Sequence, residues 1–158
     1  MIELPVINCL KCWSRINNIN LHEVLNNFIQ PKKSSQKKFC KDCNEDVEFS
    51  RTRKIYSTPN CLILYLNNYV DGYYNNIKLK PPENLDMSKY MSGTNQSGKF
   101  SLVGAIEYLG TGKRGHYIAE CYNFIQNDKK WYLFNDEITE ETEVDDIDSP
   151  IILFYEKN

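Results

Sequence analysis

Two short stretches in the last third of the chain, Gly115-His116-Tyr117-Ile118-Ala119 and Trp131-Tyr132-Leu133-Phe134-Asn135-Asp136, decide how this sequence is interpreted. Both are rich in aromatic and aliphatic residues, as strands are, and the polar pair Asn127-Asp128 lies between the strands that they belong to. The pattern predicts a β-hairpin whose strands cover residues 117–125 and 130–134. The two open ends of such a hairpin lie close together.

A histidine stands at one of these open ends and two polar side chains stand at the other. Asn135 or Asp136 is therefore expected to reach an imidazole nitrogen of His116. A side-chain oxygen that accepts the Nδ1 proton would fix the tautomer and leave Nε2 free as a base toward a thiol or hydroxyl. The alternative is a histidine that merely ends a strand in a polar loop. The second histidine, His22, is expected to be a structural or surface residue.

A helix is predicted over residues 20–30. Asn20 is a good N-cap, Glu23 completes the spacing of a capping box, and Pro31 stops the helix. The apolar residues recur at helical spacing and form one stripe: Leu21, Val24, Leu25, Phe28 and Ile29.

The rest of the chain has the pattern of a β-rich α+β unit with one helix and roughly six strands, mostly in an antiparallel sheet. The run at residues 61–66 is continuously apolar, as in a strand covered on both faces. Residues 110–115 are glycine-rich and are expected to form a flexible loop. The further expected elements are strands at 100–108 and 151–155 and a hairpin with arms at 47–49 and 54–56.

Length and charge limit the class of protein. The chain has 158 residues, 25% of them charged, and a net charge of −2, which is typical of one globular domain. The negative charge disfavours nucleic acid as the main partner, and the longest apolar run is too short to cross a membrane. No signal peptide is recognisable at the first residues. A basic loop at 31–39 either contacts an acidic partner or is simply solvated, and an acidic stretch at 137–148 carries seven carboxylates.

Four of the six cysteines form two Cys-x-x-Cys pairs, Cys9 with Cys12 and Cys40 with Cys43. Without a secretion signal, such pairs indicate metal ligands before disulfides. One structural zinc ion on these four thiolates is one interpretation, and four reduced cysteines in a degenerate finger are the other. A reducing compartment, the cytoplasm or the nucleus, is expected.

Taken together, these motifs resemble the C-terminal half of a ubiquitin-specific protease, a family of papain-like cysteine deubiquitinases. The resemblance runs in order along nearly the whole chain. It is strongest at the box Gly115-His116-Tyr117-Ile118-Ala119 and the box Trp131 to Asp136. Further matching segments are Cys40-x-x-Cys43, Pro59 to Leu66, Leu85-Asp86-Met87, Phe100 to Ile106 and Ile152 to Glu156.

The resemblance implies a papain-like fold, with a finger or zinc-ribbon part at about 1–56 and a palm sheet at about 57–158. It implies that His116 is the general base, that Asn135 holds the third position of a catalytic triad and that Asp136 assists. Gly115 and Tyr117 would line the channel for the Gly-Gly tail of ubiquitin. The implied partner is ubiquitin or a ubiquitinated protein, and the implied reaction is hydrolysis of the isopeptide bond after ubiquitin's terminal glycine.

The sequence departs from the family pattern because it has no box for the catalytic cysteine. Cys61 is expected to be a buried, inert thiol, and Cys121 should point to the opposite face of the strand from His116, about 17 Å away. The N-terminal thumb is thus expected to be absent, and a missing N-terminal half or a partner chain would supply the nucleophile. The isolated chain is predicted to be inactive. The alternative is a pseudoenzyme that binds ubiquitin or scaffolds a complex.

Overall fold

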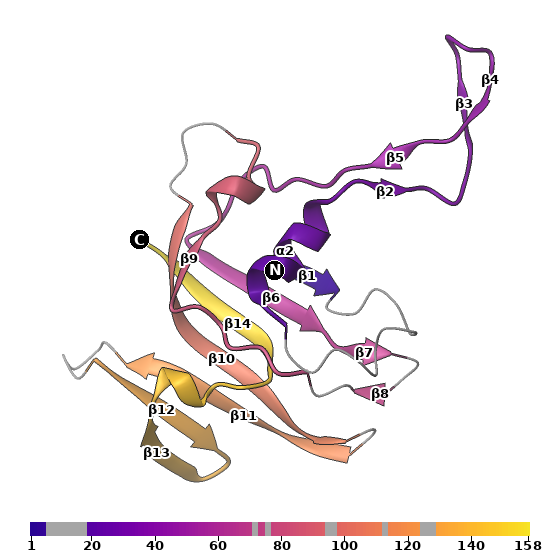
Figure 1. The fold of residues 1–158 in the computed structure, drawn as a ribbon. Helices are drawn as coiled ribbons and strands as arrows, with labels where there is room; N and C mark the ends of the chain where they lie inside the picture. Colours follow the sequence, from indigo (N-terminus) through magenta and orange to yellow (C-terminus); the bar gives the residue numbers. More distant parts are fainter. Residues whose placement is uncertain (6–18, 71–72, 75–76, 94–97, 112–113, 124–128) are drawn as a thin grey trace.

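The computed structural model describes residues 1–5, 19–70, 73–74, 77–93, 98–111, 114–123 and 129–158. They build one curved, mixed sheet of eight strands (Figure 1). Only the pairing of β1 with β6 is parallel, and the remaining pairings are antiparallel. Along the sheet the order is β1 (Ile2–Pro5), β6 (Cys61–Asn67), β14 (Pro150–Lys157), β10 (Lys99–Thr111), β11 (Arg114–Asn123), β12 (Lys130–Asn135) and β13 (Ile138–Thr142), with β9 (Asn84–Asp86) also beside β10. The expected α+β architecture is confirmed.

The helix forms where its apolar stripe predicts it, as α2 (Leu21–Ile29). The Asn20 side chain caps it by accepting a hydrogen bond from the backbone N–H of His22 at 2.7 Å. The chain leaves the helix at Gln30, before Pro31. Leu21, Val24 and Leu25 are buried and join the core of the sheet, so packing fixes the helix against β1 and β6.

Strand β6 alternates between buried and partly exposed residues, which differs from the expected strand covered on both faces. Leu62, Leu64 and Leu66 are buried in the core, whereas Cys61 is exposed and Ile63 is half-buried. The apolar run is continuous in sequence because its outer face is also apolar. Periodicity alone therefore does not reveal which face is covered.

A two-stranded arm projects from the sheet beside the end of α2 (Figure 1). Its stem pairs β2 (Lys32–Lys33) with β5 (Ser50–Arg51), and its tip pairs β3 (Lys38–Cys40) with β4 (Glu45–Val47). The expected hairpin between residues 47–49 and 54–56 is wrong. Val47 instead pairs with Lys38 at the tip of the arm, and Ile55 bridges to Met91.

The strands around the glycine-rich segment are longer than the sequence pattern indicates. Gly110 pairs with Gly115 and Thr111 with Arg114, so β10 and β11 continue through most of the expected loop at 110–115. The ladder can continue because glycine permits the close approach of two strands.

Three smaller elements complete the described residues: a β7 (Tyr69–Val70) and β8 (Tyr73–Tyr74) hairpin, and the 3₁₀ turns η1 (Ser88–Tyr90) and η2 (Val144–Asp146). None of the helices in the described part of the chain has the length and apolar character needed to span a membrane.

Candidate active site

The pairing of β11 with β12 sets the relative positions of His116 and Asn135. Ala119 lies opposite Phe134, which places Asn135 one step further along the ladder, at the end of β12. His116 lies further toward the same end of β11, on the face that Ile118 also occupies, because side chains alternate along a strand. The register therefore brings the histidine and the asparagine to one corner of the sheet.

The imidazole of His116 contacts the side chain of Asn135 at this corner. The distance from His116 Nε2 to Asn135 Oδ1 is 2.6 Å. Because an amide oxygen only accepts hydrogen bonds, Nε2 carries the proton and donates it. In the neutral ring this arrangement leaves Nδ1 as the nitrogen without a proton. The expectation that Nδ1 would be held and Nε2 free is thus wrong, although the pairing with Asn135 is present.

Asp136 lies beside the same imidazole but at a longer distance. Its Oδ2 is 3.6 Å from His116 Nε2, and its side chain is 79% exposed. Asp136 begins the tight turn between β12 and β13 with a φ of 52°, a left-handed conformation that Asp tolerates. The carboxylate is therefore a solvated neighbour of the ring, and the amide of Asn135 is its direct partner.

The residue before the histidine is a glycine because an aromatic ring occupies the space next to it. A Cβ at Gly115 would lie 2.5 Å from Cε2 of Tyr108 and would overlap the rest of that ring. Tyr108 is buried and lies opposite Tyr117 in the β10–β11 ladder. Gly115 thus lets the Tyr108 ring pack against the start of β11.

Tyr108 belongs to a row of aromatic rings that the sequence analysis did not identify. Its ring centroid lies 4.6 Å from that of Tyr74 and 5.0 Å from that of Tyr117. Tyr69 continues the row at 5.6 Å from Tyr74. Tyr117 is 55% exposed, so the row ends at the surface, on the face of β11 opposite the His116 side chain. The row joins residues of β7, β8, β10 and β11, and no periodic pattern in the sequence connects them.

Two buried carboxyl groups lie on the same face of the sheet as His116. Glu107 accepts hydrogen bonds from the backbone N–H groups of Asp148 and Ser149. Glu120 is 3% exposed, and burial together with the neighbouring Glu107 raises the pKa of its carboxyl to about 7. Glu120 therefore holds its proton up to near-neutral pH.

The described cysteines lie away from His116. Cys61 is exposed, contrary to the expected burial. It lies opposite Glu156 in β14, and Glu156 lies opposite Ser101 near the start of β10. His116 lies beside the other end of β10, opposite Leu109. Cys121 is five residues beyond His116 on β11, an odd offset that places it on the opposite face. Burial of its thiol raises the pKa of Cys121.

Two of the four paired cysteines lie within the described residues. Cys40 ends β3 and Cys43 follows in the turn to β4, while Cys9 and Cys12 fall outside the described residues. Hydrogen bonds from the backbone at Cys43 and Asp42 lower the pKa of the Cys40 thiol. In the described part of the chain no three His, Cys, Asp or Glu side chains form a metal cluster.

His22 has a structural environment that differs from that of His116. Its Nδ1 lies 2.9 Å from the hydroxyl of Tyr90, a buried residue of η1. The contact ties the first turn of α2 to η1.

In the Cys-His-Asn triads of cysteine peptidases an asparagine orients the histidine, and the contact between His116 and Asn135 resembles that part of such a triad. A sequence model of one family of such hydrolases, described as "Ubiquitin carboxyl-terminal hydrolase", matches residues 6–155. The chain belongs to the ubiquitin carboxyl-terminal hydrolase family.

Curated relatives agree with this assignment. The chain is 26% identical over 133 residues to the probable ubiquitin carboxyl-terminal hydrolase 16 of Schizosaccharomyces pombe, covering 80% of this chain and 28% of the relative. It is 28% identical over 127 residues to ubiquitin carboxyl-terminal hydrolase 15 of Homo sapiens, covering 75% of this chain and 13% of the relative. The chain thus spans less than a third of the length of either relative.

Solved structures agree on the fold. The SAGA Ubp8/Sgf11/Sus1/Sgf73 DUB module bound to ubiquitin aldehyde contains a chain that matches with a TM-score of 0.79 and 21% identity, over 99% of this chain and 35% of that one. A yeast SAGA DUB module with a mutant Sgf73 subunit matches with a TM-score of 0.81 and 22% identity, over 99% of this chain and 34% of that one.

Proposed function

We propose that this chain carries the base and the orienting amide of a cysteine-type deubiquitinase, which hydrolyses the isopeptide bond after the terminal glycine of ubiquitin. The observation that carries the proposal is the 2.6 Å contact between His116 Nε2 and Asn135 Oδ1. The family match over residues 6–155 supports the choice of substrate.

In the proposed reaction, Nδ1 of His116 accepts the proton of a cysteine thiol. The thiolate attacks the carbonyl carbon of the terminal glycine, and the imidazolium then gives its proton to the leaving lysine amine. Water hydrolyses the resulting thioester with His116 as the base. Asn135 keeps the ring in one orientation and adds no charge, and Asp136 stabilises the imidazolium as a solvated neighbour.

The nucleophile in this proposal comes from outside the chain, from a further segment or from a partner chain. The positions of Cys61 and Cys121 support this, because neither thiol lies at the corner that His116 and Asn135 occupy. The same observation favours a second candidate function, in which the protein binds ubiquitin or scaffolds a complex without catalysis.

Gly115 and Tyr117 are proposed to line the channel for the Gly-Gly tail of ubiquitin. The exposed ring of Tyr117 would cover the tail while the backbone of Gly115 stays close to it. With the Tyr108 ring filling the side-chain space of Gly115, the channel would be narrow and would favour glycines.

A structural zinc ion on Cys9, Cys12, Cys40 and Cys43 is a further part of the proposal. The Cys40 thiol, which accepts backbone hydrogen bonds in a tight turn, has the chemistry of a zinc ligand. The zinc would hold the tip of the arm together. Reduced thiols at these positions would place the protein in the cytoplasm or the nucleus.

The proposal is tested with ubiquitin that carries a C-terminal electrophile and with ubiquitin that lacks its last two glycines. We expect no covalent adduct with the chain alone, and we expect NMR signals of His116 and Tyr117 to shift with intact ubiquitin only. An adduct on Cys61 or Cys121 would contradict the assignment of the nucleophile. Equal shifts with both forms, or no shifts at high micromolar concentration, would contradict tail binding.

The catalytic and the scaffold functions are then separated by adding the missing part. A protein that joins this chain to a cysteine-bearing segment should cleave a fluorogenic ubiquitin amide, and His116→Ala should lower kcat by about a thousandfold or more. Binding without cleavage in that protein would favour the scaffold function.

A further inference from the structure

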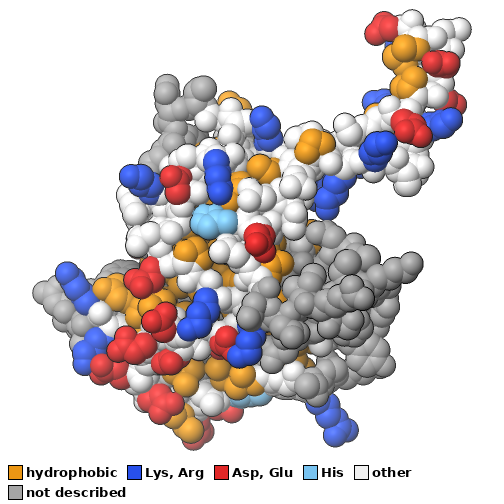
Figure 2. All heavy atoms as spheres, in the orientation of Figure 1, with side chains coloured by type: hydrophobic (Ala, Val, Ile, Leu, Met, Phe, Trp, Pro, Cys, Tyr) orange, Lys and Arg blue, Asp and Glu red, His pale blue; other side chains and the backbone are white. Residues whose placement is uncertain are grey.

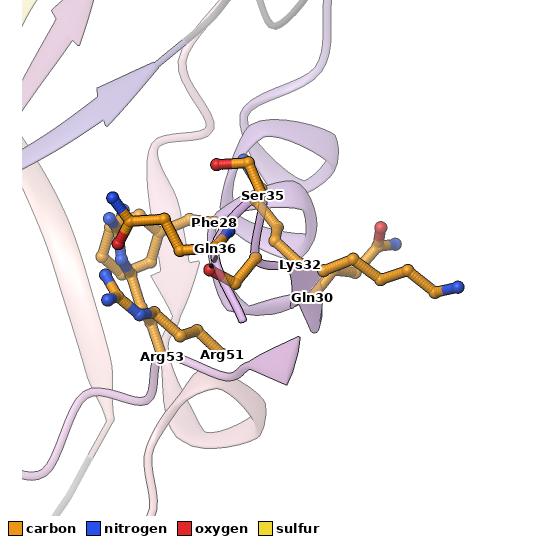
Figure 3. Close-up of a pocket in the computed structure, with 9 residues that line it drawn as sticks. Phe28, Gln30, Lys32, Ser35, Gln36, Arg51 and Arg53 are labelled. Carbon is orange, nitrogen blue, oxygen red and sulfur yellow. Dashed lines mark hydrogen bonds between the residues drawn. The ribbon is translucent and has the colours of Figure 1, made fainter. Parts of the chain in front are cut away.

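A pocket at the base of the projecting arm has a basic lining. It has a volume of about 280 Å³ and lies between the end of α2 and the stem strands β2 and β5 (Figure 3). Lys32, Lys33, Arg51 and Arg53 contribute its charge, and none of the described residues that line it is acidic. The basic loop noted in the sequence is therefore joined in space by two arginines from about twenty residues further along the chain.

Charge is segregated along the arm. The stem, residues 30–37 and 49–54, contains six Lys and Arg residues and no Asp or Glu, whereas the tip, residues 38–48, contains two lysines and four acidic residues. Basic side chains accordingly gather along the stem, and acidic ones appear toward the tip, in Figure 2. The two signs of charge are thus separated along the length of the arm.

The stem places like charges face to face. Lys32 and Arg51 are directly opposite each other in the register of the ribbon. Like charges at opposite positions destabilise a strand pair, and a two-stranded ribbon is only marginally stable to begin with.

Two aromatic rings orient the guanidinium groups of Arg51 and Arg53 in a way that suits binding of a carboxylate. The Arg53 guanidinium lies over the ring of Phe28, 5.6 Å from its centroid, and the Arg51 guanidinium lies over Phe49 at 5.8 Å. In Figure 3 both arginine side chains and Gln36 lie on the Phe28 side of the pocket, while Lys32 extends away from them. Stacking orders the planar guanidinium groups while leaving their N–H groups able to donate two parallel hydrogen bonds.

We propose that this pocket binds an acidic segment of a partner protein in extended conformation, with carboxylates two residues apart, as in Glu-x-Glu. Arg51 and Arg53 are themselves two residues apart, so the spacing of the cations matches that of alternate side chains on an extended peptide. This docking surface is separate from the corner that holds His116, and the inference does not depend on the proposed function.

An acidic peptide suits this surface better than a nucleic acid does. A long polyanion would extend beyond the pocket and meet the rest of a chain whose net charge is −2. A short peptide would contact the stem alone, where Gln36 and the serine hydroxyls add neutral hydrogen-bonding groups.

The test measures fluorescence anisotropy of a labelled peptide, Glu-Ser-Glu-Ser-Glu, with the full chain. Arg51→Gln combined with Arg53→Gln should weaken binding about tenfold or more, because two charge-assisted contacts are lost. The matched control is Lys38→Gln combined with Lys41→Gln, which removes the same charge from the tip and should change affinity less than about twofold. Arg53→Lys, which keeps the charge but loses the stacked fork, should weaken binding about threefold.

Further measurements decide between classes of ligand. A Gln-Ser-Gln-Ser-Gln peptide should not compete, and raising the salt concentration should weaken binding of the acidic peptide. Absence of binding, unchanged affinity in the double arginine variant, or equal losses in the control variant would overturn the proposal. Preferential binding of a single-stranded oligonucleotide that the acidic peptide cannot displace would overturn it as well.

Discussion

The sheet and the arm use opposite means to hold functional side chains in place. At the sheet corner, His116 and Asn135 are positioned by the register of β11 and β12, on the same face as buried Ile118 and Glu120, and their side chains contact each other directly. In the arm, strands of two or three residues are almost entirely exposed, and stacking of arginines on aromatic rings replaces burial. The difference shows that burial and strand register fix the side chains of the sheet, whereas contacts at the surface order those of the arm.

The largest difference between the two regions should appear when a large apolar side chain is removed. Leu64→Ala, in β6 where the residue is fully buried, should lower the free energy of unfolding by about 3 kcal/mol through lost burial and a cavity. Phe39→Ala, in β3 where the ring is 55% exposed, should change it by less than about 0.5 kcal/mol. Urea unfolding of both variants measures the contrast, and similar losses would mean that the arm is part of the cooperative core.

The sheet should also show a pH dependence that the arm lacks. Because the pKa of Glu120 is raised to about 7 in the folded protein from a usual value of 4.5, the unfolded chain releases this proton first as pH increases. Stability should therefore fall between pH 4.5 and 7, by about 2 kcal/mol once solvent screening is allowed for, and level off above that range. Urea midpoints across this range provide the measurement.

Glu120→Gln isolates this effect, since the amide can still donate a hydrogen bond to Glu107 but does not titrate. The variant should flatten the pH profile, and Glu140→Gln on the exposed strand β13 should not. A profile that keeps its slope in Glu120→Gln would assign the pH dependence to other groups.

The corner of the sheet can be disturbed through the residue that precedes the histidine. Gly115→Ala should destabilise the protein by about 1–2 kcal/mol and displace the Tyr108 ring. Tyr108→Ala should remove most of this penalty, so a double-mutant cycle should give a coupling of about 1 kcal/mol. Additive losses would show that the ring does not respond to the new methyl group.

The smallest global effect is expected from metal removal. If zinc holds the tip of the arm, a chelator should abolish amide protection in residues 38–47 while the unfolding free energy of the sheet changes by less than about 0.5 kcal/mol. Hydrogen exchange before and after chelation compares the two regions directly. Unchanged protection of the tip would contradict a zinc site, and loss of protection across the sheet would contradict the independence of the arm.

Much of the sheet follows from local sequence signals. The capped, amphipathic pattern predicts α2, and the two stretches at 115–119 and 131–136 predict the corner where His116 contacts Asn135. Which imidazole nitrogen is held did not follow, because the orientation of a ring depends on its packing and not on strand register. The exposure of Cys61 was missed for a similar reason, since an apolar run does not specify which of its faces is covered.

The arm was harder to predict because its strand pairings join residues with no apolar pattern. Lys32 pairs with Arg51 and Lys38 with Val47, and neither pairing buries a side chain that would fix the register. The row of tyrosines beside Gly115 was missed because it assembles from three separate segments. Both cases show that contacts between distant segments, without periodicity, are not visible in the sequence alone.

The most direct test of the account is the tautomer of His116, measured by long-range ¹H–¹⁵N NMR of the folded chain at neutral pH. In the neutral form of the ring, the contact with Asn135 predicts the proton on Nε2 and Nδ1 unprotonated, and Asn135→Ala should weaken this preference to that of a free imidazole. A neutral ring with its proton on Nδ1, or a ratio of the two tautomers that does not change in Asn135→Ala, would contradict the assignment of His116 as a base that the asparagine orients.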